Sequence, residues 1–151
     1  MKASELMTPD PACITPGDSV QAAARLMGSY NVGSLPVVEG GDNKRLVGII
    51  TDRDVAIGAV AEGRMDATVA DVMTPNPRTV HEEDDASRVE EIMAEEQVRR
   101  VPVVNERGAV VGMIAQADLA LAENGISDRT VGRVVEKISE PEGSGPGSSR
   151  A

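Results

Sequence analysis

The sequence contains no tryptophan and no phenylalanine, and Tyr30 is its single aromatic residue. Stacking on nucleic-acid bases needs aromatic side chains, and binding to a phosphate backbone needs a basic face. The chain of 151 residues instead has a formal charge of −10. With one cysteine and one histidine, a disulfide framework and the usual Cys/His metal sites are excluded. We therefore expect no nucleic-acid partner and no metal.

Long hydrophobic runs are also missing. No apolar stretch approaches the ~20 residues that span a bilayer, and the polar start of the sequence does not resemble a signal peptide. These features predict a cytoplasmic protein without a membrane partner. The sequence contains no nucleophile–base arrangement, Walker-type loop or dinucleotide fingerprint either. We therefore expect a protein that is not an enzyme.

The main positive feature is an internal repeat. The segment 7–55 returns as 73–119, so that Met7-Thr8-Pro9 corresponds to Met73-Thr74-Pro75. A unit of this length buries little apolar surface alone, so the copies are predicted to pack around a pseudo-two-fold axis, with two clefts between them. We predict the following division: repeat 1 with a lead-in helix over 1–66, repeat 2 with a lead-in helix over 67–125, a terminal helix over 126–138 and a disordered tail over 139–151.

Each copy reads as strand, helix, strand, strand, helix, which predicts an α/β fold. Asp18 is expected to cap a helix from about Ser19 to Tyr30, and the equivalent helix is expected to begin near Asp85. The segments 35–38 and 101–104 are almost wholly apolar, which is typical of strands covered on both faces.

A glycine interrupts the next strand in each copy, Gly48 in 46–50 and Gly112 in 110–114. Glycine within a strand often marks the close approach of another backbone or of a ligand. This pattern makes the ends of these strands candidate binding positions.

The segment from Thr51 to Asp54 is the most informative candidate site. A strand is predicted to end at Thr51 and a helix to begin, and a hydroxyl at the start of a helix suits a phosphate. Asp54 can accept two hydrogen bonds from a diol such as ribose. The alternative is a capping box, in which Thr51 and Asp54 bind each other's backbone amides and no ligand binds.

Arg99 and Arg100 form the second candidate, because they lead directly into an apolar strand. At least one guanidinium is expected to face a cleft or its rim, where a phosphate would suit it. The alternative is that both are solvated or paired with nearby glutamates. The corresponding residues of the first copy, Gly33 and Ser34, are small enough to admit a planar ring against the backbone.

The duplicated MTP lead-in, the V-x-x-x-P-V-V strands from Val32 and Val98, and the G-[IM]-I-x-x-x-D junctions resemble tandem cystathionine β-synthase (CBS) domains, a Bateman module. The resemblance covers residues 3–121 and extends to small stand-alone bacterial members. It implies two β-α-β-β-α repeats around a pseudo-two-fold axis. It also implies a non-catalytic regulatory module whose clefts between the repeats bind adenosine-containing ligands, such as AMP, ADP, ATP, NAD or S-adenosylmethionine.

The resemblance further implies signalling through a change of shape or of partner, with an adenine nucleotide as regulatory ligand and no required cofactor. A homodimer and an unidentified protein target are expected. The alternative is a structural dimerisation module with degenerate clefts.

The resemblance also assigns residues to the two clefts. In one, Thr51 contacts phosphate, Asp54 contacts ribose, Val98 lies against the base, and Arg99 and Arg100 approach the phosphates. The other combines Asp118 with Val32, Gly33 and Ser34. Ala115 stands in this second cleft where the family pattern has a hydroxyl, so one phosphate contact is missing there.

Overall fold

Two separate β-sheets organise residues 1–123, the part of the chain that the computed structural model describes. Residues 10–77 and 106–110 form one compact unit, the first-repeat unit. Residues 1–9, 78–105 and 111–123 form the other, the second-repeat unit. The predicted terminal helix over 126–138 and tail over 139–151 lie outside the described residues.

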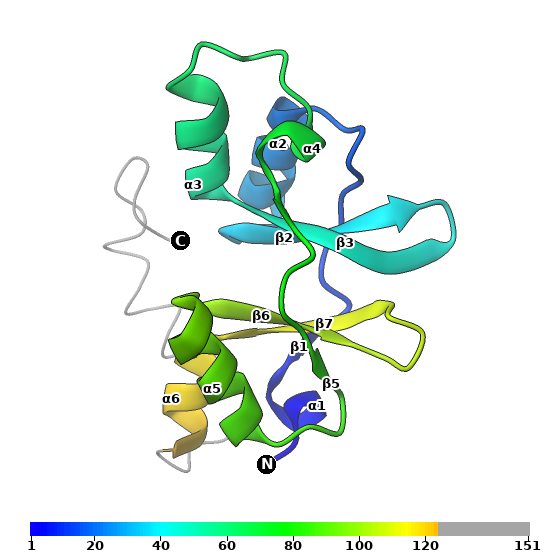
Figure 1. Cartoon of the computed structure of the whole chain (residues 1–151), viewed down its shortest axis with the longest axis vertical. Coiled ribbons are helices and arrows are strands. Elements are labelled where there is room, and N and C mark those ends of the chain that lie inside the picture. Colours follow the sequence, from blue (N-terminus) through cyan, green and yellow to red (C-terminus); the bar gives the residue numbers. More distant parts are fainter. Residues whose placement is uncertain (124–151) are drawn as a thin grey trace. The chain divides into compact units, whose positions relative to one another are not determined.

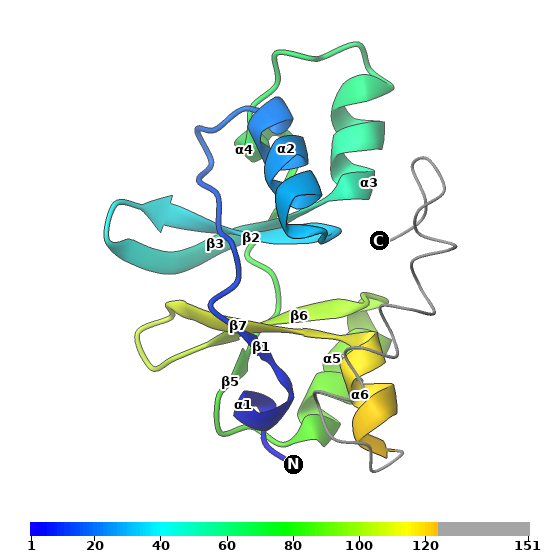
Figure 2. The same cartoon turned by 180° about the vertical axis from the view of Figure 1, so that it is seen from behind.

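The first-repeat unit has a three-stranded antiparallel sheet in the order β2-β3-β4. In Figures 1 and 2 its helices α2, α3 and α4 lie on one side of the β2–β3 hairpin. Its elements are α2 (Val20–Tyr30), β2 (Ser34–Gly40), β3 (Asn43–Thr51), α3 (Asp52–Val55), the π-helical turn η1 (Ala56–Val60), α4 (Val69–Val72) and β4 (Thr74–Pro75).

The second-repeat unit has a four-stranded mixed sheet in the order β1-β7-β6-β5, in which β5 and β6 are parallel. Its elements are α1 (Ala3–Leu6), β1 (Thr8–Pro9), β5 (Val80–His81), α5 (Ala86–Glu96), β6 (Arg100–Val104), β7 (Val110–Ala115) and α6 (Gln116–Glu123). Both units thus combine helices with a β-sheet, and the predicted α/β fold is confirmed.

The lead-in helices are exchanged between the repeats. Helix α1 precedes repeat 1 in the sequence but packs against α5, α6 and β5 of the second-repeat unit. Its Ala3 is fully buried in that core. Helix α4 precedes repeat 2 but buries Val69 in the first-repeat core. The compact units therefore differ from the predicted division of the chain at residue 66, although the repeats themselves follow the sequence.

Apolar side chains from the helices and strands form the core of each unit. In the first-repeat unit the largest buried cluster contains Ile14, Ala23, Met27, Leu35, Val37, Ile50 and Val69. In the second-repeat unit it contains Ala3, Leu6, Val80, Val89, Ile92, Met93, Val101, Val103, Ile114 and Leu119. Burial of these aliphatic side chains, each worth about 1.5–3 kcal/mol for the larger residues, provides a core without aromatic rings.

The long helices begin and end through local hydrogen bonds. Helix α5 begins next to Asp85 as predicted, and the Asp85 side chain caps it by accepting a hydrogen bond from the Ser87 amide at 3.0 Å. The prediction that Asp18 caps α2 is wrong by one residue. Ser19 is the cap and accepts a hydrogen bond from the Ala22 amide, while Asp18 accepts from the amide and hydroxyl of Thr15. Asp18 stabilises the preceding turn instead.

The strand glycines allow a methionine side chain to lie directly on the sheet. A Cβ atom at Gly48 would lie 2.6 Å from Met73 Sδ and 3.0 Å from the Thr74 carbonyl oxygen. At Gly112 it would overlap Met7 Sδ and lie 2.7 Å from Met7 Cγ. The predicted close approach is therefore present in both copies, and a lead-in segment of the protein itself makes it.

Acid titration is expected to remove a stabilising contact at the start of α5. Hydrogen bonds from the backbone and side chain of Ser87, together with the Met1 α-ammonium group 3.3 Å away, lower the pKa of Asp85 from 3.8 to about 2. Because the pKa of Asp85 is lower in the folded protein than in the unfolded chain, this stabilisation is fully present when the pH is above the ordinary pKa of 3.8. It is lost as the pH falls through about 2. Asp85→Asn should therefore lower stability at neutral pH and reduce the loss of stability on acidification.

Urea unfolding of the wild-type protein and Asp85→Asn between neutral pH and pH 2 measures this effect. Asp42→Asn, at an exposed position in the β2–β3 turn, is the matched control. The explanation would be contradicted if Asp85→Asn and the control followed the same pH dependence as the wild-type protein.

Candidate functional site

The junction between β3 and α3 holds the first candidate pair, Thr51 and Asp54. Thr51 Oγ1 accepts a hydrogen bond from the Asp54 amide at 3.0 Å, and Asp54 Oδ2 accepts one from the Thr51 amide at 2.9 Å. This is a complete capping box. The hydrogen-bonding pattern of the non-binding alternative is therefore present.

The capping box does not use the whole bonding capacity of the pair. A hydroxyl has one hydrogen to donate, and a carboxylate has two acceptor oxygens. Within residues 1–123, the Thr51 hydroxyl donates no hydrogen bond and Asp54 Oδ1 accepts none. Both residues are half-buried. The junction can therefore offer one donor and one acceptor to a ligand while the backbone remains capped.

Three more of the predicted site residues lie beside this junction, in the same unit. Ser34 pairs with Thr51 in the β2–β3 register, and the Asp52 amide donates a hydrogen bond to the Gly33 carbonyl oxygen at 3.0 Å. Val32 precedes them and leaves 41% of its surface exposed. The structure thus brings Val32, Gly33 and Ser34 next to Thr51, whereas the sequence prediction placed them with Asp118.

The second-repeat unit contains a corresponding junction between β7 and α6. Asp118 Oδ2 accepts a hydrogen bond from the Ala115 amide at 2.8 Å, which is half of the capping box seen in the other unit. The Gln116 amide donates to the Arg99 carbonyl oxygen at 2.8 Å, just as Asp52 does to Gly33. Alanine lacks the hydroxyl, so this junction has a carboxylate but no donor equivalent to that of Thr51.

Two valines lead into these junctions in the same way. Helices α2 and α5 both end in a left-handed residue, Asn31 or Gln97, and the amide of the following valine bonds back to a methionine carbonyl of the helix. Val32 and Val98 are both 41% exposed as a result. An exposed apolar side chain near a few fixed polar groups is the combination that small-molecule sites use.

The structure places all nine predicted residues near the two junctions, but its contacts group them by unit. Thr51 and Asp54 lie with Val32, Gly33 and Ser34, while Asp118 lies with the segment from Val98 to Arg100. The predicted pairing of Thr51 and Asp54 with Val98, Arg99 and Arg100 joins residues of different units. It stays a prediction.

Sequence reasoning missed two residues that pack against the elements on either side of the Thr51 junction. Met73 lies on Gly48 of β3, and Val72 lies against Gly58 of η1, where a Cβ atom would be 2.9 Å from its side chain. The recurrence of a methionine and a strand glycine in both copies was the available signal. It does not reveal which methionine contacts which glycine, because the lead-in segments are exchanged.

The remaining candidates show no arrangement for catalysis or metal binding. Burial raises the pKa of the Cys13 thiol, against an opposing effect of Lys44, and the thiol donates a hydrogen bond to the Pro11 carbonyl oxygen. A thiol of this kind is a poor nucleophile. In the described part of the chain, no group of three or more His, Cys, Asp or Glu side chains is placed to hold a metal ion. None of the helices in this part has the length and apolar character needed to cross a membrane.

Comparison with known proteins gives a consistent result. The family model of the CBS domain matches residues 3–58 and 69–125. The CBS domain-containing protein YhcV of Bacillus subtilis is 39% identical over 141 residues, which cover 89% of this chain and 93% of that protein.

Solved structures of CBS pairs are similar as well. The CBS domain pair of protein MJ0100, in complex with 5-methylthioadenosine and S-adenosyl-L-methionine, is 29% identical with a TM-score of 0.75, and the match covers 83% of this chain and 97% of that one. CBSX2 in complex with AMP is 26% identical with a TM-score of 0.70, and the match covers 82% and 96%.

Proposed function

Because this chain belongs to the CBS domain family, we propose that it is a non-catalytic regulatory module that binds adenosine-containing ligands. AMP is the first candidate, and ADP, ATP, NAD and S-adenosylmethionine belong to the same class. The observation that carries the proposal is the Thr51–Asp54 junction. One hydroxyl donor and one carboxylate oxygen stay uncommitted there, and the exposed Val32 lies in the segment beside them. Two similar CBS pairs, with bound AMP or with adenosine derivatives, support the choice of ligand class.

Each proposed role follows from the chemistry of the side chain. Asp54 accepts hydrogen bonds from the ribose hydroxyls through Oδ1, because Oδ2 is committed to the Thr51 amide. The Thr51 hydroxyl donates a hydrogen bond to a phosphate oxygen, since its own oxygen already accepts a hydrogen bond from the Asp54 amide. Val98 lies against the base, and Arg99 and Arg100 contribute positive charge to the phosphates. Asp118 with Val32, Gly33 and Ser34 forms the second, weaker position.

The ligand acts by changing the shape of the module or its choice of partner. We propose a homodimer in the cytoplasm that acts on a protein target. The acidic composition, −10 over the whole chain, disfavours nucleic acid as that target, since nucleic acid repels a surface of the same sign.

The complete capping box favours a second candidate function, a structural dimerisation module with degenerate clefts. In that case Thr51 and Asp54 serve only the backbone of α3, and no nucleotide stabilises the fold. The two functions differ in a property that is simple to measure, the effect of adenine nucleotides on thermal unfolding.

A thermal-shift screen with AMP, ADP, ATP, NAD and S-adenosylmethionine is the test. A ligand present at 100 times its Kd should stabilise the folded protein by about 2.7 kcal/mol, because it binds the folded state and not the unfolded chain. GMP at equal concentration controls for binding through the ribose and phosphate, because it differs from AMP only in the base. Unchanged melting temperatures with every adenosine compound would favour the structural module.

A further inference from the structure

The connector between the repeats, residues 73–78, links the Thr51 junction to the second-repeat unit. The boundary between the two compact units falls within it, between Pro77 and Arg78. Each end of the connector is held by contacts inside its own unit. The two units are therefore joined by a short segment, and contacts within each unit fix the end of the segment that belongs to it.

At its first end the connector is fixed to the strand that carries Thr51. Thr74 and Pro75 pair with β3, and the Asn76 amide donates a hydrogen bond to the Val47 carbonyl oxygen at 3.1 Å. Met73 lies on Gly48 of the same strand without room for a Cβ atom. Since packed contacts of this kind have no free space, a displacement of β3 near Thr51 must also displace the connector.

The helical turn η1, which follows α3, contacts the residue directly before the connector. Val72, directly before the connector, lies against Gly58 of η1, and α4 packs against η1. The strand before the Thr51 junction and the helical turn after it are thus both in contact with the residues that lead into the connector.

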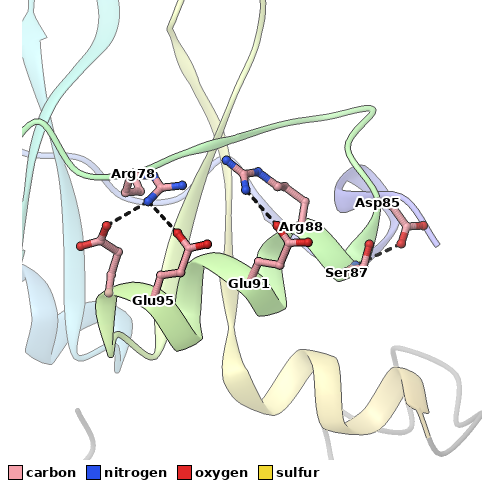
Figure 3. Close-up of polar contacts among 7 residues, drawn as sticks. Arg78, Asp85, Ser87, Arg88, Glu91 and Glu95 are labelled. Atoms are coloured by element: carbon pink, nitrogen blue, oxygen red, sulfur yellow. Dashed lines mark hydrogen bonds and ion pairs between the residues drawn. The ribbon is translucent and has the colours of Figure 1, made fainter.

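At its other end the connector is fixed to the last turn of α5. Arg78 Nη1 lies 3.0 Å from a carboxylate oxygen of Glu95 and 3.0 Å from one of Glu96, as seen for Glu95 in Figure 3. Hydrogen bonds to Glu95 and then Glu96 raise the pKa of Arg78. These two glutamates end the helix, and the segment from Val98 to Arg100 follows after one left-handed residue.

Comparison of the two repeats shows that the ion pairs are not needed by the fold itself. The residue of repeat 1 that corresponds to Arg78 is Ala12, and the residues that correspond to Glu95 and Glu96 are Ser29 and Tyr30. Helix α2 forms and ends in the same left-handed conformation without them. The cation and both acids occur together only at the connector.

We propose that this connector is a coupling element, through which occupation of the Thr51–Asp54 junction is transmitted to the end of α5. The proposal rests on the proposed ligand-binding function and adds to it the route by which one repeat responds to the other. Arg78 is a positioning residue in this scheme. Because the pairs are exposed, their contribution to stability is small, whereas their geometry determines where the connector holds α5.

Amide hydrogen exchange with AMP as the probe tests the proposal. In the wild-type protein, saturating AMP should slow exchange at the Asn76 amide and at the amides of 95–97 by about fivefold or more, the lower end of typical coupling factors. In Arg78→Gln the effect at Asn76 should remain and the effect at 95–97 should be lost. Arg88→Gln is the matched control, because it removes an exposed 2.9 Å pair with Glu91 on the same helix. It should retain both effects.

A ligand-free measurement separates this inference from the proposed function. Met73→Ala removes the side chain from Gly48 and should speed exchange at 95–97, and this increase should disappear in the Arg78→Gln background. Absence of binding by AMP and by every other adenosine compound of the screen would refute the proposed function but leave this comparison decisive for the connector. The inference would be overturned if Met73→Ala left 95–97 unchanged, or if AMP bound and Arg78→Gln responded like the wild-type protein.

Discussion

Gly112→Ala is expected to destabilise the second-repeat unit by about 1–3 kcal/mol, the usual cost of overpacking. The added Cβ atom would overlap Met7 Sδ and lie 2.7 Å and 2.9 Å from Met7 Cγ and Cβ. The flexible end of a methionine can rotate away, but Cβ is attached to the backbone of Met7, directly before β1, and β1 pairs with β7 at Gly112. The lead-in strand must therefore move. Urea unfolding followed by circular dichroism measures the change.

Gly28→Ala is the matched control for this substitution. Gly28 lies within α2, and a Cβ atom there would meet no heavy atom within 4 Å. The same replacement should stabilise the protein by roughly 0.5–1 kcal/mol, because alanine loses less conformational freedom than glycine in a helix. Adding Met7→Ala to Gly112→Ala should recover part of the lost stability. If Gly112→Ala were as well tolerated as Gly28→Ala, the exchanged contact between β1 and β7 would be disproved.

Asp54→Ala should abolish the tighter phase of AMP binding, whereas Asp118→Ala should leave it largely intact. The reason is the hydroxyl of Thr51, which Ala115 cannot replace in the other junction. A hydrogen bond to a charged group contributes roughly 1.5–3 kcal/mol, which corresponds to about 10- to 150-fold in affinity. Calorimetric titration of both variants with AMP measures the difference.

Loss of the capping box is a separate effect of Asp54→Ala and requires its own control. Asp71 accepts a hydrogen bond from the Thr68 amide at 2.9 Å in the capping box of α4. Asp71→Ala should therefore lower stability without changing the affinity for AMP. Equal losses of affinity from Asp54→Ala and Asp118→Ala, or a larger loss from Asp118→Ala, would mean that the two positions are assigned wrongly.

Local features near the site could be predicted from the sequence because short-range chemistry determines them. Thr51 has a hydroxyl at the end of an apolar strand and an aspartate one helical turn later, so its capping role follows from spacing alone. The start of α5 near Asp85 is predicted by local sequence as well. At the start of α2, Asp18 and Ser19 are adjacent and both are good caps. Spacing alone could not show which of them caps the helix. In the structure Asp18 accepts a hydrogen bond from Thr15, which leaves Ser19 as the cap.

Long-range features could not be predicted, because they depend on which segments meet in space. The repeat predicts a lead-in helix before each copy, but not that α1 packs on the second-repeat core and α4 on the first. The position of Gly33 and Ser34 beside Thr51 depends likewise on the β2–β3 register. Glycine at position 48 signals a close neighbour, but only the exchanged packing identifies this neighbour as Met73.

The most direct test of the proposed function is a titration of the isotope-labelled wild-type protein with AMP, followed through the amide signals in ¹H–¹⁵N NMR spectra. Binding at the proposed position should shift the Thr51 and Asp54 amides most strongly among residues of the first-repeat unit, because these amides form the capping box that the ligand contacts. Saturation of the titration without movement of these two signals would contradict the account. So would spectra that stay unchanged at millimolar concentrations of AMP and of each other adenosine compound of the proposed class.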